Sequence, residues 1–130
     1  MKKDEGGSVL TVDDLLHECL YPVMLGSNAL CHACVRQIQK QYGIGSTVLT
    51  GKRALTLRFL PSVTLIGAPP VLGDEILLAI LADVEMDAGA RIPLLVLCDE
   101  AYAPFFDRNK EGLGARFILR RAEELLGEKF

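Results

Sequence analysis

The chain has no apolar run long enough to cross a bilayer, although half of its 130 residues are hydrophobic and its mean hydropathy is +0.28. A membrane-spanning helix needs roughly 18 to 20 consecutive apolar residues. The start, MKKDEGGSV, mixes charges of both signs with no apolar stretch behind it, so we expect neither a secretory signal nor a transit peptide. These absences predict a soluble, cytoplasmic protein that has no contact with a membrane.

An excess of basic charge is also absent. Fourteen Lys and Arg residues stand against 17 Asp and Glu residues, so the net charge is -3 and the pI is near 5.4. Within the predicted domain the basic residues are scattered apart from the pairs Lys52-Arg53 and Arg120-Arg121. Because a phosphate backbone is attracted by clustered positive charge, we do not expect a nucleic acid partner.

The chain also lacks an internal repeat, a low-complexity segment and a linker-like run. Its length is that of one ordinary domain with a core of its own. We therefore expect a flexible tail over residues 1–10 and a single domain over residues 11–130.

Hydrophobic periodicity predicts alternating strands and helices along most of the chain. The predicted strands cover residues 22–25, 46–49, 63–66, 92–98 and 116–119, and the predicted helices lie within residues 11–19, 28–42, 74–88, 100–110 and 120–126. Residues 51–62 show no clear period and are interpreted as a loop with a helical turn. The alternation predicts an α/β fold with three αβα layers, in which helices cover a mostly parallel, Rossmann-like sheet of about five strands in the order 3-2-1-4-5.

A Cys-x-x-Cys pair, Cys31 and Cys34, lies within the helix predicted over residues 28–42. Helical spacing places both cysteines on the apolar side of that helix, so we interpret them as reduced core residues. A thioredoxin-type disulfide would need its first cysteine at the helix N-terminus, where the free N–H groups stabilise a thiolate. A zinc site would need a second pair of ligands, which the remaining candidates do not supply: Cys19, His17 and Cys98. We therefore expect no bound metal, and keep the redox interpretation as an alternative.

The opposite side of the same helix collects polar residues, which we expect to face solvent: His32, Arg36, Gln39 and Lys40.

The turn Gly26-Ser27-Asn28 joins the first predicted strand to this helix. Unpaired N–H groups at a helix N-terminus bind anions readily. The dinucleotide fingerprint G-x-G-x-x-G is missing, and no acidic residue closes the second strand, where Thr50-Gly51-Lys52-Arg53 stands, so a nicotinamide dinucleotide site is disfavoured. The alternative is a plain turn in which Ser27 or Asn28 caps the helix.

Ligands of open α/β sheets sit beyond the carboxyl ends of the strands, where the strand order reverses. In the predicted order, that point brings together the turn after the first strand and the turn after the fourth. N–H groups of one turn could bind a carboxylate, and acidic side chains of the other could bind an amine. Asp99 and Glu100 have a competing interpretation as the acidic first residues of the next helix. The candidate substrate-binding residues are Gly26, Ser27, Asn28, Asp99, Glu100 and Tyr102, and Lys52 and Arg53 are possible anion-binding residues; no catalytic residue is assigned.

Three stretches carry a family resemblance over nearly the whole chain from about residue 20: PVMLGSNALCHACVRQIQKQYGIGSTVLTG, LPSVTLIGAP and PLLVLCDEAYAPFFDRNKEGLGARFIL, followed by AEELLGEKF. This pattern resembles the N-terminal pre-ATP-grasp domain of ATP-grasp ligases, especially the carbamoyl-phosphate-synthase-like group that includes D-aspartate ligases. The CHAC segment and the KRALTLRF segment are not features of that family.

The resemblance implies that the chain is a fragment of a longer ligase and is not catalytic alone. Such enzymes activate a carboxylate as an acyl phosphate, which an amine then attacks. ATP and Mg²⁺ would be bound by an ATP-grasp domain that follows this chain. This chain would contact a small carboxylate or amine substrate and would hold no cofactor itself.

Two other functions remain open. One is a flavodoxin-like or receiver-like domain that acts by docking to a partner, although no acidic pair follows the first strand as a receiver requires. The other is a thioredoxin-like oxidoreductase that uses Cys31 and Cys34.

Overall fold

The computed structural model describes residues 20–51 and 63–127. The predicted tail, the helix predicted within residues 11–19 and the anion-binding candidates Lys52 and Arg53 lie outside these ranges.

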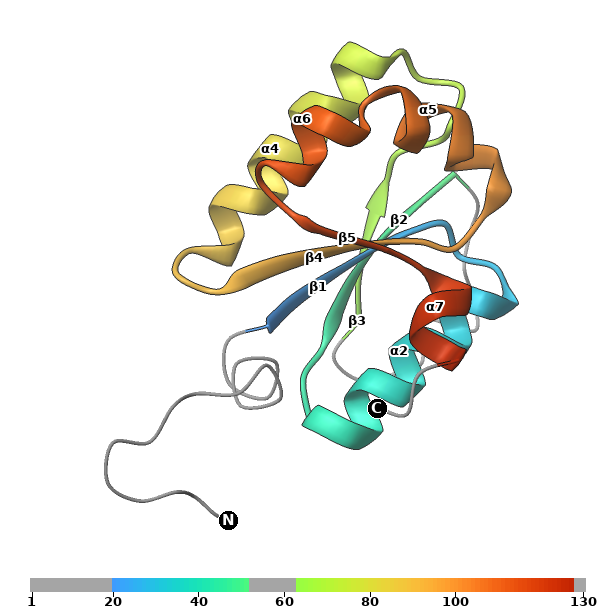
Figure 1. The fold of residues 1–130 in the computed structure, drawn as a ribbon, viewed down its shortest axis with the longest axis vertical. Helices are drawn as coiled ribbons and strands as arrows, with labels where there is room; N and C mark the ends of the chain where they lie inside the picture. Colours follow the sequence, from blue (N-terminus) through green and yellow to red (C-terminus); the bar gives the residue numbers. More distant parts are fainter. Residues whose placement is uncertain (1–19, 52–62, 128–130) are drawn as a thin grey trace.

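The centre of the structure is a sheet of five strands, all paired in parallel, in the order β3-β2-β1-β4-β5 (Figure 1). The strands are β1 (Leu20–Leu25), β2 (Ser46–Thr50), β3 (Val63–Gly67), β4 (Ile92–Leu97) and β5 (Ile118–Arg121). β1 and β4 lie side by side at the centre over six paired residues each. The predicted fold class and strand order are confirmed.

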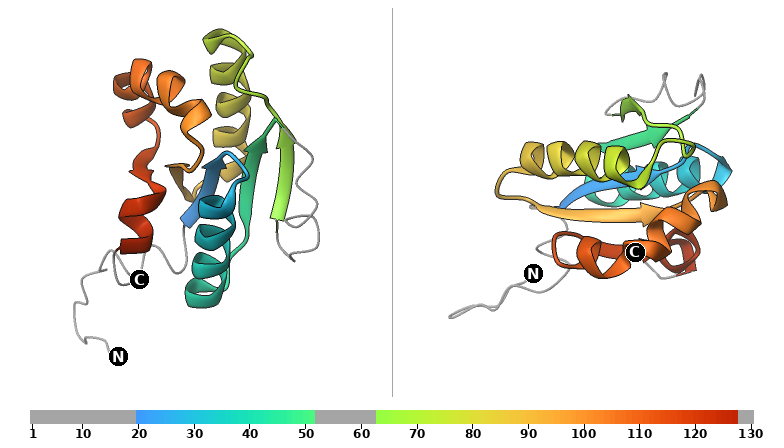
Figure 2. Two further views of the ribbon diagram at one scale, coloured as in Figure 1. Left: turned by 90° about the vertical axis from the view of Figure 1, so that its right-hand side faces the viewer. Right: turned by 90° about the horizontal axis from the view of Figure 1, so that it is seen from above.

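Helices cover both faces of the sheet (Figure 2). One layer holds α2 (Ala29–Tyr42) and α7 (Ala122–Gly127), and the other holds α4 (Asp74–Ala88), the 3-10 turn η1 (Glu100–Tyr102), α5 (Ala103–Arg108) and α6 (Lys110–Gly114). Alternate residues of β1 enter opposite cores: Met24 packs toward α2, whereas Val23 and Leu25 pack toward α4. This alternation gives the three-layer architecture two separate hydrophobic cores.

Helices α2 and α4 begin and end close to where their sequences predict. Asn28 caps α2, and Gly43, which has a φ of 70°, ends it. The side chains that α2 buries are those that helical spacing predicts: Cys31, Cys34, Val35, Ile38 and Tyr42. Acidic residues in the first turn of α4, Asp74 and Glu75, favour its N-terminus.

Residues 100–110 are helical apart from Asn109, as predicted, but they form η1, α5 and the start of α6 instead of one continuous helix. The break falls at Asn109, whose backbone leaves the helical region at a φ of -110° and a ψ of 16°. The side chain of Asn109 donates to Asp74 of α4 and to the carbonyl of Phe105, at 2.9 Å each. Arg108 adds an ion pair to Asp74 through two hydrogen bonds. Contacts with α4 therefore stabilise the break between α5 and α6.

The last strand begins at Ile118, two residues later than predicted. The backbone N–H groups of Arg116 and Phe117 donate to the carbonyl of Leu113, at 3.0 and 2.8 Å. These bonds belong to the turn that ends α6, so residues 116 and 117 have no N–H groups left for the sheet.

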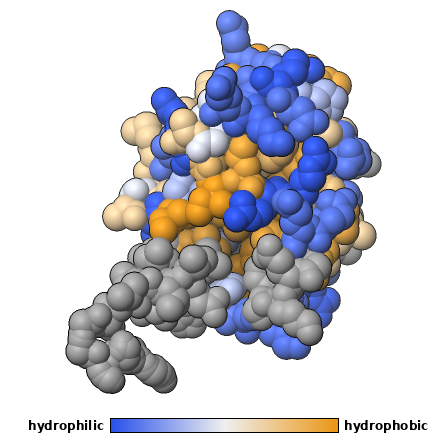
Figure 3. All heavy atoms as spheres, in the orientation of Figure 1, coloured by the Kyte–Doolittle hydropathy of each residue, from blue (hydrophilic) through white to orange (hydrophobic). Residues whose placement is uncertain are grey.

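Strand β5 forms one edge of the sheet. Figure 3 shows hydrophobic surface across the middle of the face that Figure 1 views, where β5 runs. Ile118 is the first residue of this strand and is 38% exposed. Arg120 and Arg121 continue the strand, and charged side chains on an edge strand discourage pairing with another chain.

Candidate functional site

The turns after β1 and β4 touch each other at the carboxyl edge of the sheet. The N–H groups of Cys98 and Asp99 both donate to the carbonyl of Leu25, at 3.0 and 3.1 Å. Gly26 is buried with a φ of 108°, and a Cβ atom on it would lie 2.9 Å from the backbone nitrogen of Asp99 and collide with its Cβ. The two turns that flank the strand-order reversal therefore meet, as the strand order predicts.

Asn28 ties the start of α2 to the end of β4. Its Oδ1 accepts from the N–H of Cys31 at 3.1 Å, which is the capping bond of the helix. Its Nδ2 donates to the carbonyl of Cys98 at 3.0 Å. The capping interpretation of Asn28 is confirmed, and the second bond adds a link between the two turns that the sequence does not indicate.

Ser27 extends these links to the neighbouring strand. Its hydroxyl lies 2.6 Å from the hydroxyl of Thr50, the last residue of β2. Gly51 follows and lies close to Pro69, because a Cβ atom on Gly51 would be 2.9 Å from the Cα of that proline. The turns after β1, β2 and β3 are therefore packed along one rim of the sheet.

Asp99 and Glu100 differ in how far the fold uses their carboxylates. The Oδ1 of Asp99 accepts from the N–H of Ala101 at 3.0 Å and so caps η1, as the competing interpretation of this residue expected. Glu100 is exposed, and within the described ranges its carboxylate makes no hydrogen bond or ion pair. Glu100 is thus the acidic group of this rim that is available to a ligand without breaking an internal contact.

Tyr102 faces inward. Its side chain is 1% exposed, and its hydroxyl donates to the carbonyl of Ala68 at 2.7 Å. Burial, with a smaller contribution from the charge of Asp99, raises the pKa of Tyr102 to about 12. The tyrosine therefore links the turn after β4 to the turn after β3, and its hydroxyl is already engaged by the protein.

The rim presents two kinds of polar group to solvent. The N–H groups of Ala29 and Leu30, in the first turn of α2, have no acceptor within the helix and carry its positive dipole end. The turn across the contact contains Asp99, whose carboxylate caps η1, and the exposed carboxylate of Glu100. This arrangement can hold a carboxylate on one side and an ammonium group on the other.

Three of the four cysteines meet just beneath this rim. Cys31, Cys34 and Cys98 belong to one buried cluster. The thiol of Cys98 lies 3.9 Å from the carbonyl of Val96 and 4.0 Å from the sulfur of Met24, and the thiol of Cys34 lies 3.9 Å from the carbonyl of Ala122. The neighbouring thiol of Cys98 lowers the pKa of Cys34, whereas the two neighbouring thiols, together with burial, raise the pKa of Cys98.

Sequence reasoning missed Cys98 as a member of this cluster. The sequence did contain a signal for it: Cys98 ends the strand predicted over residues 92–98, and the predicted order places that strand beside the first strand, which leads into the helix of Cys31 and Cys34. All three thiols are free and buried, as predicted for Cys31 and Cys34. In the described ranges no three His, Cys, Asp or Glu residues form a group that could hold a metal ion.

Comparisons of the chain with protein-family models, curated proteins and solved structures found no match. None of the helices within residues 20–51 and 63–127 combines the length and apolar character that crossing a membrane requires.

Two substitutions at Asn28 separate its two bonds. Asn28→Ala removes both and is expected to lower the free energy of unfolding by about 1 to 2 kcal/mol. Asn28→Asp keeps an oxygen that caps α2 but loses the donor to Cys98, so it should fall between alanine and the wild type. Urea unfolding followed by circular dichroism measures the order. Equal losses in the two variants would show that the capping bond contributes nothing.

Proposed function

We propose that the chain is the substrate-side module of an ATP-dependent carboxylate–amine ligase of the ATP-grasp type. In this proposal the domain forms one wall of the substrate site, and an ATP-grasp domain that follows it binds ATP and Mg²⁺. The fold is consistent with a pre-ATP-grasp domain, since such a domain is expected to be a Rossmann-like sheet. The resembling stretches also supply β1, α2, β4 and η1, the elements that build the rim.

The contact between the turns after β1 and β4 is the observation that carries the proposal. It brings the turn that leads into α2 against the turn that contains Asp99 and Glu100. Opposite polar groups at a strand-order reversal suit a small zwitterion, such as an amino acid. A ligase that joins an amine to a carboxylate uses a substrate of this kind.

The role of the domain in the reaction would be binding and orientation. The N–H groups of Ala29 and Leu30 would bind the substrate carboxylate, and Glu100 would bind the ammonium group. Asn28 would keep the two turns at a fixed distance through its bond to Cys98, and Tyr102 would hold the turn after β4 to the turn after β3 through its bond to Ala68. Activation of a carboxylate as an acyl phosphate would fall to the ATP-bearing domain.

An NMR titration of the ¹⁵N-labelled chain tests this proposal. D-aspartate, L-aspartate and glutamate are added in turn, and at least one is expected to shift the amide signals of Ala29 and Leu30 in a saturable way. Glu100→Gln should weaken that binding about tenfold or more, since a charge-assisted hydrogen bond is lost. Glu111→Gln, which removes an exposed carboxylate from α6, is the matched control and should leave the affinity unchanged.

ATP with Mg²⁺ is the second arm of the titration. We expect no saturable shift and no hydrolysis by this chain, because phosphate binding is assigned to the following domain. Micromolar ATP affinity would contradict the fragment proposal. If none of the amino acids shifts the amide signals of Ala29 and Leu30, the proposed role in substrate binding is wrong. A flavodoxin-like domain that docks to a partner would then be favoured.

A further inference from the structure

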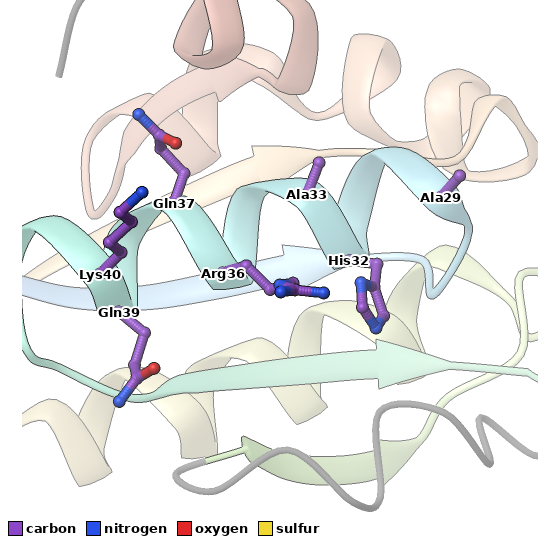
Figure 4. Close-up of a pocket in the computed structure, with 7 residues that line it drawn as sticks. All are labelled: Ala29, His32, Ala33, Arg36, Gln37, Gln39 and Lys40. Atoms are coloured by element: carbon purple, nitrogen blue, oxygen red, sulfur yellow. The ribbon is translucent and has the colours of Figure 1, made fainter.

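The exposed face of α2 carries an open groove of about 910 Å³, which extends from Ala29 at the rim toward Lys40. Among the residues that the structure describes, those that line it all belong to α2: Ala29, His32, Ala33, Arg36, Gln37, Gln39 and Lys40. Figure 4 shows His32, Arg36 and Gln39 along one side of the helix, and Ala29, Ala33 and Gln37 along the other. The short alanine side chains leave room beside the longer polar ones.

The charge of this face has one sign. Helix α2 contains no acidic residue, although the whole chain has a net charge of -3. Within the described ranges, Arg36 and Lys40 are exposed and make no ion pair. Three other arginines pair with carboxylates at 2.8 to 3.2 Å: Arg108 with Asp74, Arg116 with Glu85 and Arg121 with Asp107. Arg36 and Lys40 therefore form a positively charged face on a helix that has no acidic residue of its own to pair with them.

The spacing of the polar groups indicates the shape of an anionic partner. His32, Arg36 and Lys40 follow one another at intervals of four residues. A helix rises 1.5 Å per residue, so these groups recur about every 6 Å over a row of about 12 Å. Alternate residues of an extended peptide recur at about 6.6 Å, which matches this interval. A compact anion such as phosphate would reach only part of the row.

We propose that the groove on α2 binds an acidic peptide segment in an extended conformation, with carboxylates on alternate residues facing His32, Arg36 and Lys40. Gln39 supplies an exposed amide group that can bond to the peptide backbone, whereas the amide of Gln37 already donates to Gln41 at 3.3 Å. A nucleic acid fits less well, because none of the described lining residues is Phe, Tyr or Trp and the chain as a whole is acidic. This interaction surface meets the proposed substrate site at Ala29, but His32, Arg36 and Lys40 are not part of that site.

Fluorescence anisotropy with a fluorescein-labelled hexaglutamate peptide tests the proposal on the whole chain at low salt. The wild type should bind this peptide, and added salt should weaken the binding. Lys40→Glu should lower the affinity about tenfold, because an exposed ion pair is replaced by repulsion. Lys110→Glu is the matched control, since it changes the net charge equally at an exposed lysine of α6, on the other face of the sheet.

The controls separate this binding from general charge attraction. A hexaglutamine peptide should not bind. The proposal is overturned if hexaglutamate fails to bind the wild type, if Lys40→Glu and Lys110→Glu weaken it equally, or if a single-stranded oligonucleotide of six nucleotides binds more tightly than hexaglutamate.

Discussion

Gly26→Ala is expected to destabilise the chain by about 3 kcal/mol, since two costs add at this position. The backbone φ of 108° is one that an alanine adopts only under strain. The new methyl group would also meet Asp99, both its side chain and its backbone nitrogen, where β1 and β4 turn past each other. Urea unfolding of the two proteins measures the difference in the free energy of unfolding.

Gly112→Ala is the matched control for this effect. Gly112 lies in α6, its φ is outside the left-handed region and no atom lies within 4 Å of the position its Cβ would take. Alanine at a helical position should therefore leave the stability unchanged or raise it by about 0.5 to 1 kcal/mol. A Gly26→Ala variant as stable as the Gly112→Ala variant would mean that the two turns separate easily, and the proposed substrate site would lose its rigid wall.

The three clustered thiols are expected to react with a maleimide at least a thousandfold more slowly in the folded chain than in denaturant. Cys31, Cys34 and Cys98 are 0%, 1% and 3% exposed, so the reagent reaches them only after the structure opens. A Cys19→Ser background removes the cysteine that lies outside the described residues. Mass spectrometry of digested samples gives the labelling rate of each cysteine.

Ala33→Cys supplies an internal control for that measurement. Ala33 is exposed on the opposite side of α2, between the two buried cysteines in sequence, and a cysteine there should label at the rate of a free peptide. If Cys31 labels as quickly as this control, or is recovered as a disulfide with Cys34, the packing interpretation fails and the thioredoxin-like alternative is favoured.

Alternation and helical spacing were enough to predict the sheet and its two main helices. β4 is a nearly continuous apolar run because helices cover both of its faces. The five buried residues of α2 follow from a period of 3.6. The same patterns could not predict the break at Asn109, because its causes are bonds to Asp74, 35 residues earlier in the chain. They also could not predict that residues 116 and 117 would close the turn of α6 instead of entering β5.

For the candidate site, local sequence identified Asn28 as a helix cap and the two turns as neighbours, since these depend on nearest residues and on strand order alone. Tertiary structure decided the rest. Tyr102 was expected to face a ligand, and its hydroxyl instead bonds to Ala68, because the turn after β3 folds over it. Cys98 joins Cys31 and Cys34 because β4 ends beside the first turn of α2, although at least 64 residues separate it from the other two. Contacts between residues so far apart are set by how the layers pack, and no period along the chain encodes them.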